Sequence, residues 1–168
     1  MSIRPLSLIA PYHLVWSRDP ALDAPPEPAD DEKDAGIKDG WARWQTKIAE
    51  AHRTGNWQTL VKPGQQPTLF RVRQVPTSVA SKLLAVARSG DLDPVFELPA
   101  LSFRVALDGI EQWEAGVPDP KIEKATDQAH PKMGRIATEA VLDLLPLALV
   151  VELGTAIFNR ATNFDPLS

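Results

Sequence analysis

The stretch that decides the fold is TEAVLDLLPLALVVELGTAIF, residues 138–158. Its apolar residues recur at helical spacing on both sides of Pro146, which cannot continue a helix but fits the first turn of one. Thr138 can cap the first segment. The pattern therefore predicts two apolar helices joined at Leu145–Pro146, the second running to about Arg160. So much apolar surface must be buried, either in this chain's own core or against another chain.

The same stretch has the apolar character of a membrane span, but three residues argue against one. Asp143, Pro146 and Glu152 interrupt a window that would need about 20 predominantly apolar residues. The N-terminal apolar run is broken by Pro5 and Pro11, which is not typical of a secretory signal. We expect a buried helix pair, no membrane partner and synthesis in the cytoplasm.

Composition favours one globular domain with irregular connections. The chain has 168 residues, of which 43% are hydrophobic and 24% charged, close to the averages of soluble proteins. Its 16 prolines are about twice the usual share. The chain contains no cysteine, which excludes disulfide and thiolate chemistry.

The first 38 residues differ from the rest of the chain. Residues 18–36 combine prolines with acids and few apolar groups, so ordering them would not be repaid by burial and we expect a solvated linker. Residues 1–17 are apolar and extended, and this arm either docks on a neighbouring molecule or covers the domain's own core. We expect an arm and linker over 1–38 and a single globular domain over 39–168. The contact candidates of the arm are Leu8, Ile9, Tyr12 and Trp16.

Two helices and a hairpin are predicted in the first half of the body. Asp39 and Gly55 can cap a helix whose buried face carries Trp41, Trp44, Ile48 and His52. Residues 57–61 and 68–75 have strand composition around a proline–glycine turn, which predicts a hairpin. A helix opens at Pro76 and closes at Gly90.

The second half is predicted to contain one further helix before the final pair. This helix begins at Glu97 or Leu101 and ends at Ala115, and a loop covers residues 116–135. The fold class is therefore α+β, mostly α: a helical body with one small β-hairpin and an extended N-terminal arm.

No pattern indicates catalysis. His13, His52 and His130 lack zinc-ligand spacing, and the chain contains no G-x-S-x-G elbow and no G-K-[ST] phosphate loop. We predict no enzymatic activity, no catalytic residue, no cofactor and no bound metal.

Charge is segregated along the chain, whose net charge is -4. The centre, residues 43–88, carries eight cations and a single acid, Glu50, and acidic segments flank it on both sides. Such blocks can pair within the fold or between neighbouring copies. A protein-interaction site using this region would include Trp41, Trp44, Arg71 and Arg73, because tryptophan and arginine are enriched among interface anchors.

Two alternatives for these residues remain open. The tryptophans can instead be ordinary core residues packed against the hairpin. Alternatively, Trp41 and Trp44 with Arg43, Lys47, Arg71 and Arg73 can form a nucleic-acid-binding surface, provided that the aromatic rings are exposed for stacking.

Five short motifs carry a family resemblance: PTLFRVR at 67–73, FRVALDGI at 103–110, TE at 138–139, LDLLP at 142–146 and ELG at 152–154. Together they resemble small proteins encoded in the structural modules of tailed bacteriophages, over roughly residues 65–165. The resemblance implies a non-enzymatic component of the virion head, neck or tail, in contact with other phage structural proteins and forming a homo-oligomer or symmetric assembly. It also allows a tail-assembly chaperone that leaves the particle. The first 40 residues do not belong to the pattern.

Overall fold

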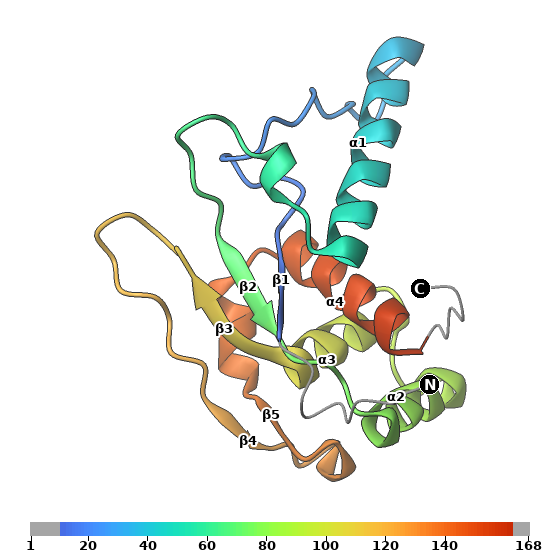
Figure 1. The fold of residues 1–168 in the computed structure, drawn as a ribbon. Helices are drawn as coiled ribbons and strands as arrows, with labels where there is room; N and C mark the ends of the chain where they lie inside the picture. The colour runs from blue at the N-terminus through green and yellow to red at the C-terminus, as the bar shows by residue number, and fades with distance from the viewer. Residues whose placement is uncertain (1–10, 163–168) are drawn as a thin grey trace, which may run out of the picture.

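The computed structural model describes residues 11–162, which form an α+β fold dominated by helices (Figure 1). The predicted fold class is confirmed. The strands are β1 (Tyr12–Leu14), β2 (Leu69–Val72), β3 (Leu107–Glu111), β4 (Lys124–Thr126) and β5 (Arg135–Ala137). The α-helices are α1 (Ala35–Thr54), α2 (Thr77–Ser89), α3 (Glu97–Ala106) and α4 (Leu147–Thr162). Short 3-10 helices cover Gln58–Leu60, Pro131–Met133 and Glu139–Leu144.

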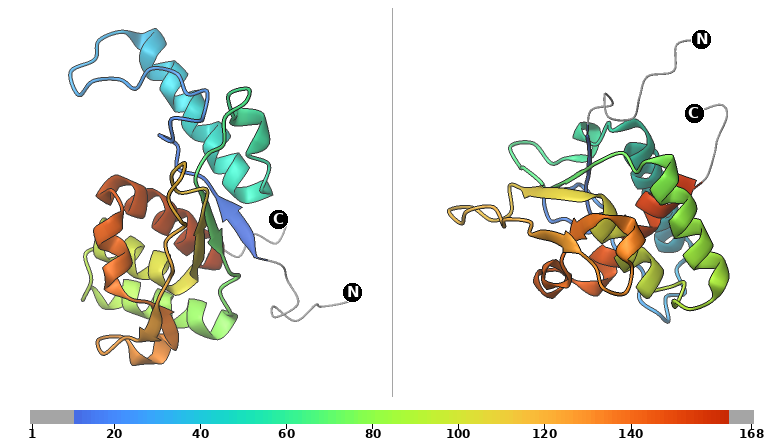
Figure 2. Two further views of the ribbon diagram at one scale, coloured as in Figure 1. Left: turned by 90° about the vertical axis from the view of Figure 1, so that its left-hand side faces the viewer. Right: turned by 90° about the horizontal axis from the view of Figure 1, so that it is seen from below.

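A three-stranded antiparallel sheet in the order β1-β2-β3 lies at the centre. Phe70 of β2 is opposite Leu14 of β1 and Ile110 of β3, and all three side chains are buried in one core cluster with residues of α3 and α4. Both helices therefore cover the same face of the sheet, as the left view of Figure 2 shows. Strands β4 and β5 form a separate antiparallel pair.

Helices α3 and α4 pack against each other at a glycine. A Cβ atom placed on Gly154 would lie 2.0 Å from the carbonyl oxygen of Pro99. The backbones can approach this closely because Gly154 has no side chain. The contact buries Phe103 and Leu153 completely, so this helix pair forms the main core.

Helix α1 has the predicted buried face but an earlier start. Trp41, Trp44 and Ile48 are buried and Gly55 ends the helix in the left-handed conformation, at φ 75°. The proposed cap, Asp39, was wrong. The cap is Asp34, whose Oδ1 accepts hydrogen bonds from the backbone of the first turn at 2.8 and 3.4 Å. The N-terminal half of α1 extends beyond the body (Figure 1).

The hairpin predicted from residues 57–61 and 68–75 is wrong. Residues Gln58–Leu60 form a 3-10 turn, and β2 pairs instead with β1 and β3, which come from distant parts of the chain. The helix predicted to reach Ala115 is also wrong beyond Ala106, because Leu107–Glu111 become strand β3. This segment forms a strand because it pairs with an edge of β2. The local periodicity of the sequence contains no information about such a distant pairing partner.

Residues 11–22 belong to the body, so the predicted arm and its boundary at residue 38 are wrong for this part of the chain. Strand β1 lies in the sheet, and Leu14, Val15 and Leu22 are each no more than 2% exposed. The backbone of Asp23 donates to the carbonyl of Leu60 at 2.9 Å. Burial thus extends into the predicted linker, and the chain becomes largely exposed only from Asp23 onward. Leu8 and Ile9 lie outside the described residues.

The helix break at Pro146 is confirmed, whereas the segment before it is a 3-10 helix over Glu139–Leu144. The backbone N–H groups of Leu149 and Val150 bond to the carbonyl of Pro146, which begins α4 at the expected place. Among residues 11–162, every helix is too short or too polar to cross a membrane. The loop predicted over 116–135 contains strand β4 and the 3-10 turn at Pro131.

Candidate interaction groove

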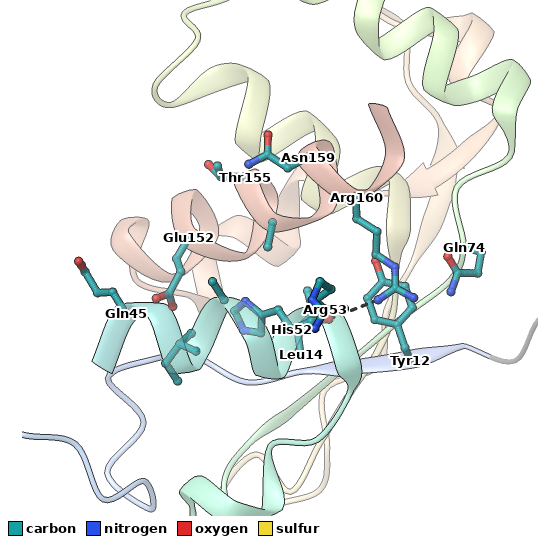
Figure 3. A pocket seen from close by; sticks show the side chains of 13 residues that line it. Tyr12, Leu14, Gln45, His52, Arg53, Gln74, Glu152, Thr155, Asn159 and Arg160 are labelled. Carbon is teal, nitrogen blue, oxygen red and sulfur yellow. Dashed lines mark hydrogen bonds between the residues drawn. The ribbon is translucent and has the colours of Figure 1, made fainter. Parts of the chain in front are cut away.

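A groove of about 690 Å³ lies between helices α1 and α4, with strand β1 at its base (Figure 3). We call it the α1–α4 groove. Its lining residues are Tyr12, Leu14, Gln45, Ile48, Ala49, His52, Arg53, Gln74, Glu152, Thr155, Ala156, Asn159 and Arg160.

Each helix contributes one stripe of residues to the groove. The α1 stripe starts at Gln45 and the α4 stripe at Glu152, and each continues at the third, fourth, seventh and eighth residue after its start. This spacing places each set on a single helical face. Small side chains at Ala49 and Ala156 leave the space between the two faces open.

The groove is apolar at its base and polar at its edges. Leu14 and Ile48 are buried beneath it, whereas Gln45, Thr155 and Asn159 are exposed at its edges. An apolar floor within a polar rim is the usual arrangement of a surface that binds another protein segment.

Three side chains fasten the backbone of residues 15–17 beside the groove. His52 Nε2 donates to the carbonyl of Val15 at 2.8 Å, and Trp44 Nε1 donates to the carbonyl of Ser17 at 3.1 Å. The Glu152 carboxylate accepts from the N–H of Ser17 at 2.9 Å. These bonds satisfy backbone groups that follow the end of β1, so this wall of the groove is held in place.

Burial sets the electrostatics of the groove. It lowers the pKa of His52, although the bond to Val15 and the nearby Glu152 both act in the opposite direction. It raises the pKa of Tyr12, against the effect of the Arg160 charge. His52 is therefore neutral at pH 7 with its proton on Nε2, and Tyr12 remains a phenol.

Arg160 closes one end of the groove, where it lies over Tyr12 (Figure 3). The guanidinium carbon is 3.7 Å from the centre of the tyrosine ring, a cation–π contact. One guanidinium nitrogen also donates to the carbonyl of His52 at 3.3 Å. Arg160 is exposed, so the arginine keeps donors available to a molecule in the groove.

Of the predicted contact residues, Tyr12 lies in the groove. Trp41 and Trp44, by contrast, do not form a binding surface. Trp41 and Trp44 are 8% and 4% exposed and pack in a cluster with Val15, Leu22 and other residues. The interface-anchor interpretation is wrong for them, and their alternative as core residues holds. Trp16 is half-buried against the main core.

Arg71 and Arg73 make contacts within the domain. Arg71 pairs with Glu111 at 2.8 Å and lies flat over Gly109, where a Cβ atom would be 2.8 Å from its guanidinium. Arg73 Nε donates to the carbonyl of Val105 at 2.9 Å. Both side chains stabilise the contacts between β2, β3 and α3, and neither lines the groove.

Sequence reasoning missed the α4 side of the groove, including Glu152, Asn159 and Arg160. A signal existed, because both helices carry polar residues in stripes next to their apolar faces. Nothing in the sequence indicated that the two stripes face each other.

A second cavity of about 380 Å³ is lined by Arg104 and by residues in or next to strands β4 and β5. The buried guanidinium pairs with Asp127 at 2.5 Å and donates to the carbonyl of Ala137 at 2.8 Å. This pairing holds the pKa of Asp127 below its usual range. The arginine therefore ties the β4–β5 pair to α3.

Within residues 11–162, no three His, Asp or Glu side chains form a group that could hold a metal ion.

Comparison with protein-family models, with curated proteins and with solved structures finds no match to this chain.

Proposed function

We propose that this chain is a non-enzymatic structural or assembly protein of a tailed bacteriophage, located in the virion and acting through protein–protein contacts. The α1–α4 groove is the observation that carries the contact role. It has an apolar base and a polar rim, and it follows two helices for about two turns. A groove of this form fits a helix or loop of another protein.

The hydrogen bonds around the groove also favour binding over chemistry. His52 and Glu152, two of the groups in the groove that could transfer a proton, each form a hydrogen bond with a backbone group of residues 15–17. Their bonds position the segment, which is the role of a structural contact.

The assignment to a phage virion depends on the resemblance of five short motifs, from PTLFRVR to ELG, to phage structural-module proteins. It is tested by quantitative mass spectrometry of purified particles from a phage encoding this chain. A fixed copy number per particle is the expected result. If the chain is present in infected cells but absent from particles, it is a tail-assembly chaperone and not a virion component.

A nucleic-acid-binding module is less well supported. Trp41 and Trp44 are buried, so they cannot stack on bases, and Arg71 is already paired with Glu111. Fluorescence anisotropy with single-stranded DNA at low salt should show no binding. Affinity that falls steeply as salt is added would favour this rival function.

A further inference from the structure

Residues 91–97, between α2 and α3, form an exposed apolar knob with acidic flanks. Val95 and Phe96 are 55% and 49% exposed. Phe96 is the one exposed aromatic side chain within residues 11–162. Exposed aromatic side chains are favoured as anchors that fill a pocket on a partner.

Hydrogen bonds hold the knob in one conformation. Asp93 Oδ1 accepts from the N–H groups of Val95 and Phe96 at 2.7 and 3.0 Å. Glu97 reaches back and accepts from the N–H of Asp93 at 2.6 Å, in the manner of a capping box. Because Pro94 further restricts the turn, docking of Phe96 would cost little conformational entropy.

The charges of the knob and the groove are complementary. The knob carries Asp91, Asp93 and Glu97 with no cation. The lining of the groove carries two cations, Arg53 and Arg160, and one carboxylate, Glu152, so its net charge is positive. Arg53 lies 3.7 Å from Glu50, but this pair is exposed, and exposed pairs exchange partners at little cost.

One copy cannot place its own knob in its own groove. In the left view of Figure 2, α4 lies between the C-terminal half of α1 and the connection from α2 to α3. A contact between the two surfaces must therefore join different copies. When each copy uses its knob on one neighbour and its groove on another, the contact is heterologous, and its repetition gives a ring or a filament.

We propose that the knob of one copy docks in the α1–α4 groove of the next copy. Phe96 enters the space over Ala49 and Ala156, and the acidic flanks face Arg53 and Arg160. This inference rests on the proposed function and deepens it by naming a second copy of this chain as a partner.

The test measures self-association of the full chain by sedimentation velocity over a range of concentrations. Wild type should form oligomers larger than dimers. Phe96→Asp should weaken association by about thirtyfold or more, the effect of losing a 2 kcal/mol anchor. Ala49→Glu, at an exposed helical position, should do the same by placing a negative charge in the groove. Val117→Asp, at an apolar side chain that is also about half exposed, should behave like wild type.

Mixing the two defective variants distinguishes this contact from other modes of association. Phe96→Asp keeps an intact groove and Ala49→Glu keeps an intact knob, so the mixture should give a 1:1 dimer that grows no further. Circular dichroism checks that each variant is folded, and Phe96→Ala replaces Phe96→Asp if that variant is not.

Three results would overturn the proposal: a wild-type chain that associates more weakly than about 1 mM, unchanged oligomers in Phe96→Asp, or no dimer in the mixture. Particle mass spectrometry tests the proposed function separately, because a virion component need not bind its own copies.

Discussion

Replacing Gly154 by alanine should destabilise this protein, although the same change stabilises most helices. Gly154 lies within α4 and faces α3, and an added Cβ would be 2.0 Å from the Pro99 carbonyl oxygen and 2.5 Å from its carbon. Both are backbone atoms, so no side-chain rotation can relieve the clash.

The size of the effect follows from two opposing terms. Contacts of a Cβ atom are essentially never shorter than 3.0 Å, so the two helices must separate by at least 3.0 − 2.0 = 1.0 Å. Overpacking in a core costs about 1–3 kcal/mol, and this clash with backbone belongs at the upper end. Alanine recovers about 1 kcal/mol through its higher helix propensity. The net loss is about 2 kcal/mol, or about 4–8 °C in Tm for a chain of this size.

Gly40→Ala is the matched control, because Gly40 is also inside a helix and, apart from its chain neighbours and the nearby backbone of α1, no atom lies within 4 Å of its added Cβ. It should raise Tm by about 2–4 °C, which corresponds to about 1 kcal/mol. Urea titration and thermal unfolding by circular dichroism measure both variants. Equal stabilisation of the two would refute the close α3–α4 contact.

Three further predictions concern the rest of the fold. Removing residues 1–36 should abolish cooperative unfolding in urea, because the deletion removes strand β1 and several buried side chains from the body. A truncated chain that unfolds like wild type would show that this segment is dispensable. The free energy of unfolding should fall as the pH drops below about 6.5, the ordinary pKa of histidine, because the folded-state pKa of His52 is lowered and the unfolded chain takes up its proton first. In denaturation experiments at several pH values, His52→Gln should make this dependence of stability on pH weaker. An unchanged dependence would exclude His52 as its source. Arg104→Met should cost about 1.5–3 kcal/mol, because it removes the charged hydrogen-bond partner of the Asp127 carboxylate, whose side chain is 10% exposed. Adding Asp127→Asn should recover part of that loss in a double-mutant cycle.

The helices with regular apolar spacing were predictable from the sequence. The buried face of α1, the end of α2 at Gly90 and the break at Pro146 all appear where the local pattern places them. In each case the signal lies within one turn or one helical face, and the residues concerned act on their own backbone.

The strands were the main failure. Segments of three to five residues, such as Tyr12–Leu14 and Leu107–Glu111, are too short to show a period. They become strands because β2 supplies hydrogen-bond partners that lie 35–60 residues away in sequence. The candidate groove was missed for a related reason, since it depends on the distance between α1 and α4.

The sequence by itself determined the α+β class, the apolar helix after Pro146 and the buried face that carries Trp41 and Trp44. These features follow from local periodicity and from the backbone preferences of proline and glycine. Only the tertiary structure decided that Tyr12–Leu14 joins the sheet and that Glu152 faces His52 across a groove. Such features arise from pairing and packing between distant segments, whose free energy depends on which surfaces meet in the folded chain.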